Sequence, residues 1–179
     1  VGMMDMAGMP SMSNLMMLVP MWAIMMIAMM GPTFVNTMIT YEALMRSANG
    51  TWGGLIGLVV GYFIVWILFG VLIALMQEGL MRIGWLDMFG QSTQLSATAA
   101  LLVLVGWFQF TWIKQVCHGV CHAPMQYFLG NWRAGTWGGS RMGLGLGIYC
   151  VVCCWGYMAL GFVGGSMNLL WMGLATVLM

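Results

Sequence analysis

The feature that most constrains the fold is an uncharged run of 25 residues at positions 52–76, WGGLIGLVVGYFIVWILFGVLIALM. As a helix this run reaches about 37 Å, which exceeds the bilayer's hydrocarbon core of about 30 Å. Charged residues make up only 5% of the chain, whereas a soluble domain carries about 25%. The sequence therefore predicts an integral membrane protein surrounded by the lipid bilayer, and the absence of a basic cluster argues against a nucleic-acid partner.

Other apolar runs predict further membrane spans. They lie at 15–41, 95–112, 142–163 and, cut short by the end of the sequence, from 169 onward. We expect an all-α, polytopic transmembrane helix bundle of about five spans, the last one truncated, in a single domain over 1–179. Pro20 suits the first turn of the first span, where its missing N–H costs little, and Pro32 is expected to kink that helix.

The few basic residues are unevenly distributed between the two sides of this bundle. One side holds four of the five, namely Arg46, Lys114, Arg133 and Arg141. The other side holds Arg82. By the positive-inside rule, the first side faces the cytoplasm. We therefore expect a cytoplasmic, Cys- and His-containing loop at 114–141 and an external, Met-rich segment at 1–14.

Glycines recur at four-residue spacing in several predicted spans. The sets are Gly53 with Gly57 and Gly61, Gly143 with Gly147, and Gly161 with Gly165. Small residues let helix backbones approach closely in lipid. This spacing predicts a compact bundle, contact with other membrane subunits through the glycine faces, or both.

Two cysteines and both histidines of the chain fall in the stretch KQVCHGVCHAP at 114–124. They are Cys117, His118, Cys121 and His122. The spacing departs from the C-x-x-C-H signal of haem attachment, and a stable disulfide is disfavoured in a reducing cytoplasm. Soft thiolates select Cu(I) or Zn(II). A metal site and a polar loop without metal are therefore the two interpretations of this stretch.

The fourth predicted span carries three more cysteines. Cys150 and Cys154 are four residues apart and share one helix face, with Cys153 at its flank. Free cysteine also packs as a small hydrophobe, so core packing is the alternative to metal binding. The 114–141 loop is rich in apolar residues and could tuck back among the helices. We hypothesise that four sulfurs meet near the cytoplasmic interface: those of Cys117, Cys121, Cys150 and Cys154.

Methionine is unusually frequent, with 23 residues. In the predicted external segment it recurs at every third position, as Met3, Met6, Met9 and Met12. Thioether sulfur is a soft ligand for Cu(I). The segment could therefore collect copper, and a Met-rich flank of a membrane helix is the alternative.

Three motifs occur in order along the chain. They are W-x-x-M-x-x-A-M-M-x-P from Trp22, Q-x4-K-x-x-C-x3-C-x-x-P from Gln109, and Y-C-x-x-C-C-W from Tyr149. Together they resemble a bacterial domain-of-unknown-function family of predicted metal-binding integral membrane proteins, over about residues 22–172. The resemblance implies a place in the bacterial inner membrane.

The resemblance also implies metal binding at the motif positions. These are Met25, Met29, Met30, Cys117, Cys121, Cys150, Cys153 and Cys154. His118 and His122 depart from the pattern, in which Leu and Arg usually follow the two loop cysteines, and Val152 replaces a usual glycine. The two histidines either add ligands or mark positions that do not bind metal.

Three functions fit these features. The favoured one is a copper-binding membrane protein that acts in metal handling or as a metal-stapled accessory subunit, with zinc or no metal as the alternatives. A purely structural subunit of a larger membrane complex comes second, and a thiol-redox oxidoreductase third. Catalysis has the least support, because no Ser-His-Asp set exists and the acidic residues lie near predicted membrane surfaces. The acidic residues are Asp5, Glu42, Glu78 and Asp87.

Overall fold

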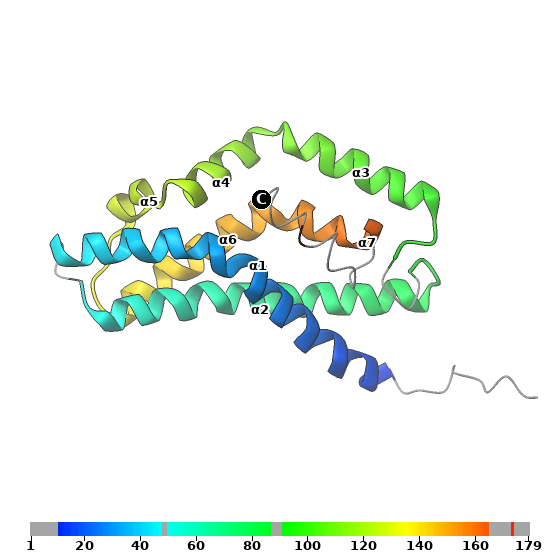
Figure 1. Ribbon diagram of the computed structural model, residues 1–179, viewed down its shortest axis with the longest axis horizontal. Coiled ribbons are helices and arrows are strands. Elements are labelled where there is room, and N and C mark those ends of the chain that lie inside the picture. The colour runs from blue at the N-terminus through cyan, green and yellow to red at the C-terminus, as the bar shows by residue number, and fades with distance from the viewer. Residues whose placement is uncertain (1–10, 48–49, 87–90, 165–172, 174–179) are drawn as a thin grey trace, which may run out of the picture.

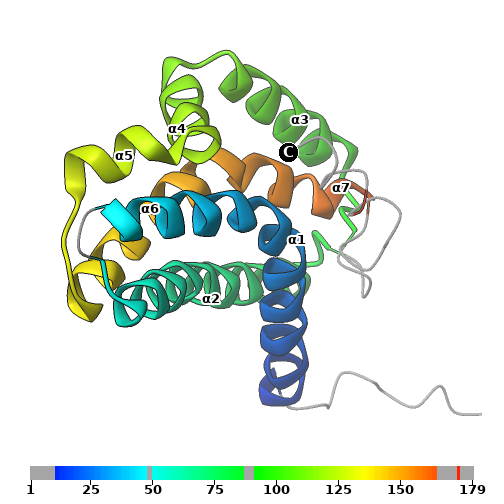
Figure 2. The ribbon, with the colours of Figure 1, turned by 60° about the vertical axis from the view of Figure 1, so that its left-hand side comes forward.

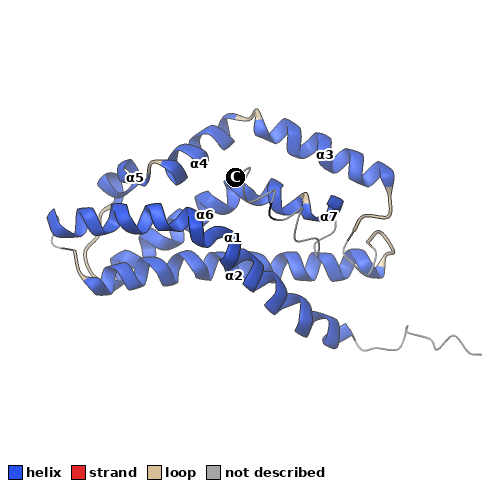
Figure 3. Cartoon of the chain, viewed as in Figure 1, coloured by secondary structure: helices blue, strands red, loops and turns tan. Residues whose placement is uncertain are grey.

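The computed structural model describes residues 11–47, 50–86, 91–164 and 173. In order, the helices are α1 (Ser11–Ser47), α2 (Trp52–Arg82), α3 (Leu95–Gln109), α4 (Trp112–His122), α5 (Pro124–Asn131), α6 (Thr136–Ala159) and α7 (Gly161–Gly164). Over the described ranges the chain contains no strand, only an isolated bridge between Leu86 and Ser92 (Figure 3). The predicted all-α helical bundle is confirmed.

Three helical segments are long and apolar enough to cross a membrane. They are Leu15–Ser47, Trp52–Arg82 and Thr136–Gly164. The predicted third span at 95–112 differs from the structure, because α3 and α4 meet at a bend of 62° and could together form a fourth, broken span. The break lies at Thr111, whose extended backbone (φ −76°, ψ 140°) precedes the first turn of α4. The predicted fifth span lies outside the described residues, except for Gly173.

The predicted loop at 114–141 is helical over most of its length. Most of α4, all of α5 and the start of α6 fall within it. Pro124 occupies the first turn of α5, where a proline N–H is not needed. Tyr127 of α5 donates a hydrogen bond to the Met142 carbonyl of α6 (3.1 Å), and burial raises the pKa of this phenol. The cysteine-bearing segment is thereby packed against the bundle.

Helix α1 contains both of the prolines that the sequence placed in the first span, but Pro20 lies inside the helix and not in its first turn, because α1 begins at Ser11. Figure 2 shows that α1 bends between its two ends, and Pro32 lies near the middle of its range. Proline removes one backbone hydrogen bond and clashes with the preceding turn, so a bend is its expected effect. The C-terminal part of α1 runs beside α2, and α3, α4 and α5 form an arch over the bundle (Figure 1).

Helices α2 and α6 pack more extensively than any other pair in the described part of the chain. Glycines bring their backbones into contact. A Cβ atom added to Gly57 would collide with the Thr136 carbonyl, and one added to Gly143 would collide with the Leu58 carbonyl. These glycine faces are therefore filled within the chain, and the expected contact with other subunits stays a prediction.

The core is aromatic and rich in methionine. Its largest fully buried side chains include Trp22, Trp66, Tyr41, Phe128, Met26 and Met30. The outside of the bundle is also apolar, with Leu68, Leu72 and Val103 more than half exposed. Such a surface is consistent with an integral membrane protein, whose outward side chains face lipid.

Candidate metal centre

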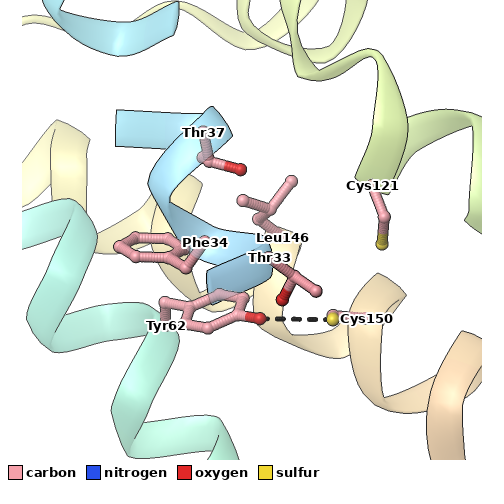
Figure 4. Close-up of a pocket in the computed structure, with 7 residues that line it drawn as sticks. All are labelled: Thr33, Phe34, Thr37, Tyr62, Cys121, Leu146 and Cys150. Carbon is pink, nitrogen blue, oxygen red and sulfur yellow. Dashed lines mark hydrogen bonds between the residues drawn. The ribbon is translucent and has the colours of Figure 1, made fainter. Parts of the chain in front are cut away.

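A small cavity lies where α1, α2, α4 and α6 meet. Its volume is about 20 Å³, enough for one water-sized particle. It is lined by Thr33, Phe34, Thr37, Tyr62, Cys121, Leu146 and Cys150. Figure 4 shows Cys121 pointing from α4 toward Cys150 on α6, with Tyr62 reaching the same point from α2. The cavity is therefore the size of one ion and is bordered by two thiols.

Cys150 has polar contacts on two sides. The Tyr62 hydroxyl donates a hydrogen bond to its Sγ at 3.2 Å. The Cys150 thiol in turn donates to the Met30 Sδ at 4.0 Å. Met30 is fully buried and Cys150 is nearly so. The Cys150 sulfur thus joins α6 to both α1 and α2 inside the bundle.

The remaining cysteines lie at the contact between α4 and α6. Together with Cys150 and Met30 they form what we call the sulfur cluster: Met30, Cys117, Cys121, Cys150, Cys153 and Cys154. Cys121 interacts with the thiols of Cys150 and Cys153, and Cys154 interacts with the same two. Cys117 lies near enough to Cys153 to interact electrostatically. All five are free thiols. The structure thus brings together the two cysteine groups that are far apart in the sequence.

A metal ion shared by two sulfurs limits the distance between them. Two sulfurs about 2.3 Å from one ion are separated by about 3.8 Å in tetrahedral and about 4.6 Å in linear coordination. The 4.0 Å between Cys150 Sγ and Met30 Sδ falls in this range. Among the described residues, no three Cys, His, Asp or Glu side chains are arranged to hold an ion. The Cys150 and Met30 sulfurs therefore fit a mixed thiol–thioether site.

Other predicted site residues lie elsewhere or cannot be placed. Met25 and Met29 pack in the hydrophobic core on α1, and the described contacts include no sulfur neighbour for either. His118 and His122 lie on α4, but their side chains are not among those described. In the external segment, Met3, Met6 and Met9 lie outside the described residues, as does the side chain of Met12.

Sequence reasoning missed Tyr62. Its hydroxyl lies in the middle of the apolar 52–76 run, at a position that is 2% exposed. A buried phenol in a membrane helix requires a hydrogen-bond partner, because lipid supplies none. That requirement signals a polar contact inside the bundle, although it does not identify Cys150 as the partner.

Lys114 was considered only for its contribution to orientation, yet it contacts α6. Its Nζ donates a hydrogen bond to the Cys153 carbonyl at 3.4 Å. The same ammonium lies 4.5 Å from the centre of the Tyr157 ring. A cation is therefore placed beside the sulfur cluster.

A known protein family matches most of the chain. The model of a family described as PpoB2, copper chaperone, matches residues 19–179. This range includes Met30, Tyr62, Lys114 and all five cysteines. Neither the curated proteins nor the solved structures contain a significant match to the chain. The matched range contains all of residues 22–172, over which the sequence motifs resemble a metal-binding family.

Proposed function

Because the chain belongs to the PpoB2 copper chaperone family, we propose that it is a membrane protein that takes up Cu(I) and holds it at the sulfur cluster for transfer. The central ligands are Cys150, Cys121 and Met30. The ion is cargo, so the site has to bind it and also release it.

The separation of Cys150 and Met30 is the observation that carries this proposal. Their sulfurs lie 4.0 Å apart on different helices. Cys150, but not Met30, also borders the ion-sized cavity, together with Cys121. Soft thiolate and thioether ligands favour Cu(I) over harder cations. Cys153 and Cys154 interact with these thiols. An ion could therefore exchange one sulfur for the next without passing through free solution.

The orientation of the helices in the membrane suggests the direction in which copper would move. Three apolar helices are long enough to cross a bilayer. The bias of basic residues favours a cytoplasmic position for Arg46, Arg133 and Arg141. With that orientation, the Met-rich segment at 1–14 would collect copper on the periplasmic side of a bacterial inner membrane, and the sulfur cluster would hold it nearer the cytoplasm.

A copper-stapled accessory subunit is the second candidate. An apolar groove of about 510 Å³ separates α3 from α2 and α6, and its walls include Phe69, Leu101, Trp155 and Phe162. Exposed apolar surfaces of this kind occur where membrane helices contact other chains or lipid. In this case copper would hold the bundle together and would not be passed on.

Copper measurements on purified, Cu(I)-loaded protein test the proposal. We expect a Cys121→Ser/Cys150→Ser variant to lose most of its copper after washing with a Cu(I) chelator. Met142→Leu is the matched control, because Met142 is a buried methionine of α6 that does not line the cavity. If the double serine variant retained as much copper as the control, the ion would not be held at this cavity.

Transfer separates the two candidates. A chaperone should lose its copper to an acceptor with sulfur ligands within the time of mixing experiments. A stapled subunit should keep its copper until the bundle unfolds. Stopped-flow transfer to a chromogenic Cu(I) chelator distinguishes these outcomes.

A further inference from the structure

Lys114 is a basic residue of α4 whose ammonium contacts the sulfur-bearing helix α6. The hydrogen bond to the Cys153 carbonyl and the contact with the Tyr157 ring fix its ammonium from two directions. Cys153 is the residue whose thiol interacts with Cys117, Cys121 and Cys154. The Lys114 ammonium is thus held at the residue, Cys153, whose thiol interacts with three other cysteines.

No carboxylate of the described residues forms a salt bridge with Lys114. Among the described residues, the salt bridges are Arg46–Glu42 and Arg82–Glu78, each within one helix. Lys114 is partly buried and takes part in neither. A partly buried cation without an anionic partner is electrostatically costly. A negatively charged ligand set beside it would remove that cost.

The net charge of a complex between thiolates and a metal ion depends on the charge of that ion. Two thiolates and one Cu(I) carry a net charge of −1, whereas the same thiolates with Zn(II) are neutral. Beside the Lys114 ammonium, the first complex gains an attraction that the second lacks. The two complexes differ by one charge for any fixed number of thiolates, so the sign of the effect does not depend on that number.

We propose that Lys114 is a specificity-determining residue that makes the sulfur cluster select monovalent Cu(I) over divalent Zn(II). Softness alone does not separate these ions, since sulfur ligands suit both. The fixed ammonium supplies the discrimination by charge. This inference rests on the proposed function, because it needs copper to bind at the cluster.

The expected effect follows from Coulomb's law. A unit charge about 8 Å from the ion, at an effective dielectric constant of about 20, changes a binding equilibrium by about 30-fold. Removing the ammonium should therefore lower the ratio of Cu(I) to Zn(II) affinity by about 30-fold. A purely structural role would weaken the binding of both ions alike and leave the ratio unchanged.

The test uses the full chain in detergent under reducing conditions. Cu(I) and Zn(II) affinities are measured by competition with chelators for the wild type, Lys114→Gln, Lys114→Met and Lys114→Arg. The methionine variant keeps an apolar stem of similar length and provides a second neutral variant if the glutamine variant fails to fold. Arg141→Gln is the matched control, because Arg141 is an exposed basic residue of α6.

We expect the affinity ratio to fall in both neutral variants and to be preserved in Lys114→Arg and in Arg141→Gln. Ag(I) and Cd(II) should reproduce the pattern as a second monovalent and divalent pair. An unchanged ratio in a folded neutral variant overturns the selectivity role while leaving the proposed copper site intact. A wild-type protein that binds no Cu(I) at all overturns both.

Discussion

The contact between α2 and α6 allows a quantitative prediction about Gly143. A methyl group at this position would lie under 3.0 Å from the backbone carbonyl oxygen of Leu58 on α2. Backbone atoms of a helix cannot move aside separately, so Gly143→Ala should push the two helices apart by about 1 Å. The close contact at this point depends on the absence of a side chain.

The energy and the local consequence can both be estimated. Overpacking of this kind costs about 1–3 kcal/mol, and the better helix propensity of alanine returns about 1 kcal/mol. The net loss of stability should therefore be up to about 2 kcal/mol. The separation would also stretch the 3.2 Å hydrogen bond from Tyr62 to Cys150, whose two residues lie on the same pair of helices.

Thermal unfolding in detergent and thiol alkylation provide the assays. Gly143→Ala should unfold at a lower temperature and should expose Cys150 to faster alkylation than in the wild type. Gly79→Ala in α2 is the matched control, because no atom lies within 4 Å of its added Cβ. Equal stability and equal Cys150 reactivity in the two variants would refute the argument that backbone contact at Gly143 holds the site.

Two further predictions concern hydrogen bonds that stabilise the helical bundle away from the sulfur cluster. Trp22→Phe removes the indole N–H that donates to the Gln77 side-chain oxygen at 2.7 Å inside the core. Because a buried acceptor then loses its partner, the free energy of unfolding should fall by about 1–3 kcal/mol, as measured by thermal unfolding. Trp52→Phe, at an exposed site, should cost much less, and a similar loss in both would count against this reason. Thr51→Ala removes the side-chain cap of α2, which accepts from Gly54 N, and should cost about 1 kcal/mol. Thr51→Asn should retain most of that stability, because asparagine also caps helices. If Thr51→Asn were as unstable as Thr51→Ala, capping would be excluded as the cause.

The helical bundle could be predicted because long uncharged runs have few alternatives to membrane helices. The boundaries were less predictable. We expected the second span to end at position 76, where hydropathy falls, but α2 continues to Arg82. Gln77 pairs with Trp22, and Glu78 pairs with Arg82. These contacts pair the Gln77 side-chain oxygen and the Glu78 carboxylate within the part of α2 that lies beyond the apolar run.

The break between α3 and α4 could not be predicted from local signals. The sequence around Thr111 contains neither glycine nor proline, which are the usual helix breakers. The extended backbone there is accompanied by packing of α4 against α6. Packing between distant segments is not encoded in a local pattern of residue types.

The candidate site was predictable where helix periodicity determines it. The shared face of Cys150 and Cys154 follows from their spacing, and both now interact with Cys153 or Cys121. The contact of Cys150 with Met30 joins residues 120 positions apart. Its geometry depends on how α1 packs against α6, which no short motif specifies.

The two sulfurs that we propose as central ligands, those of Cys150 and Met30, differ in how freely they can move. Cys150 has a short side chain on α6, and glycine contacts fix that helix against α2. Met30 carries its sulfur on a long side chain with three rotatable bonds. A metal ion could thus lose one donor by rotation of a single side chain while the other stays in place. Loading and unloading of the ion would then proceed without any rearrangement of the helices.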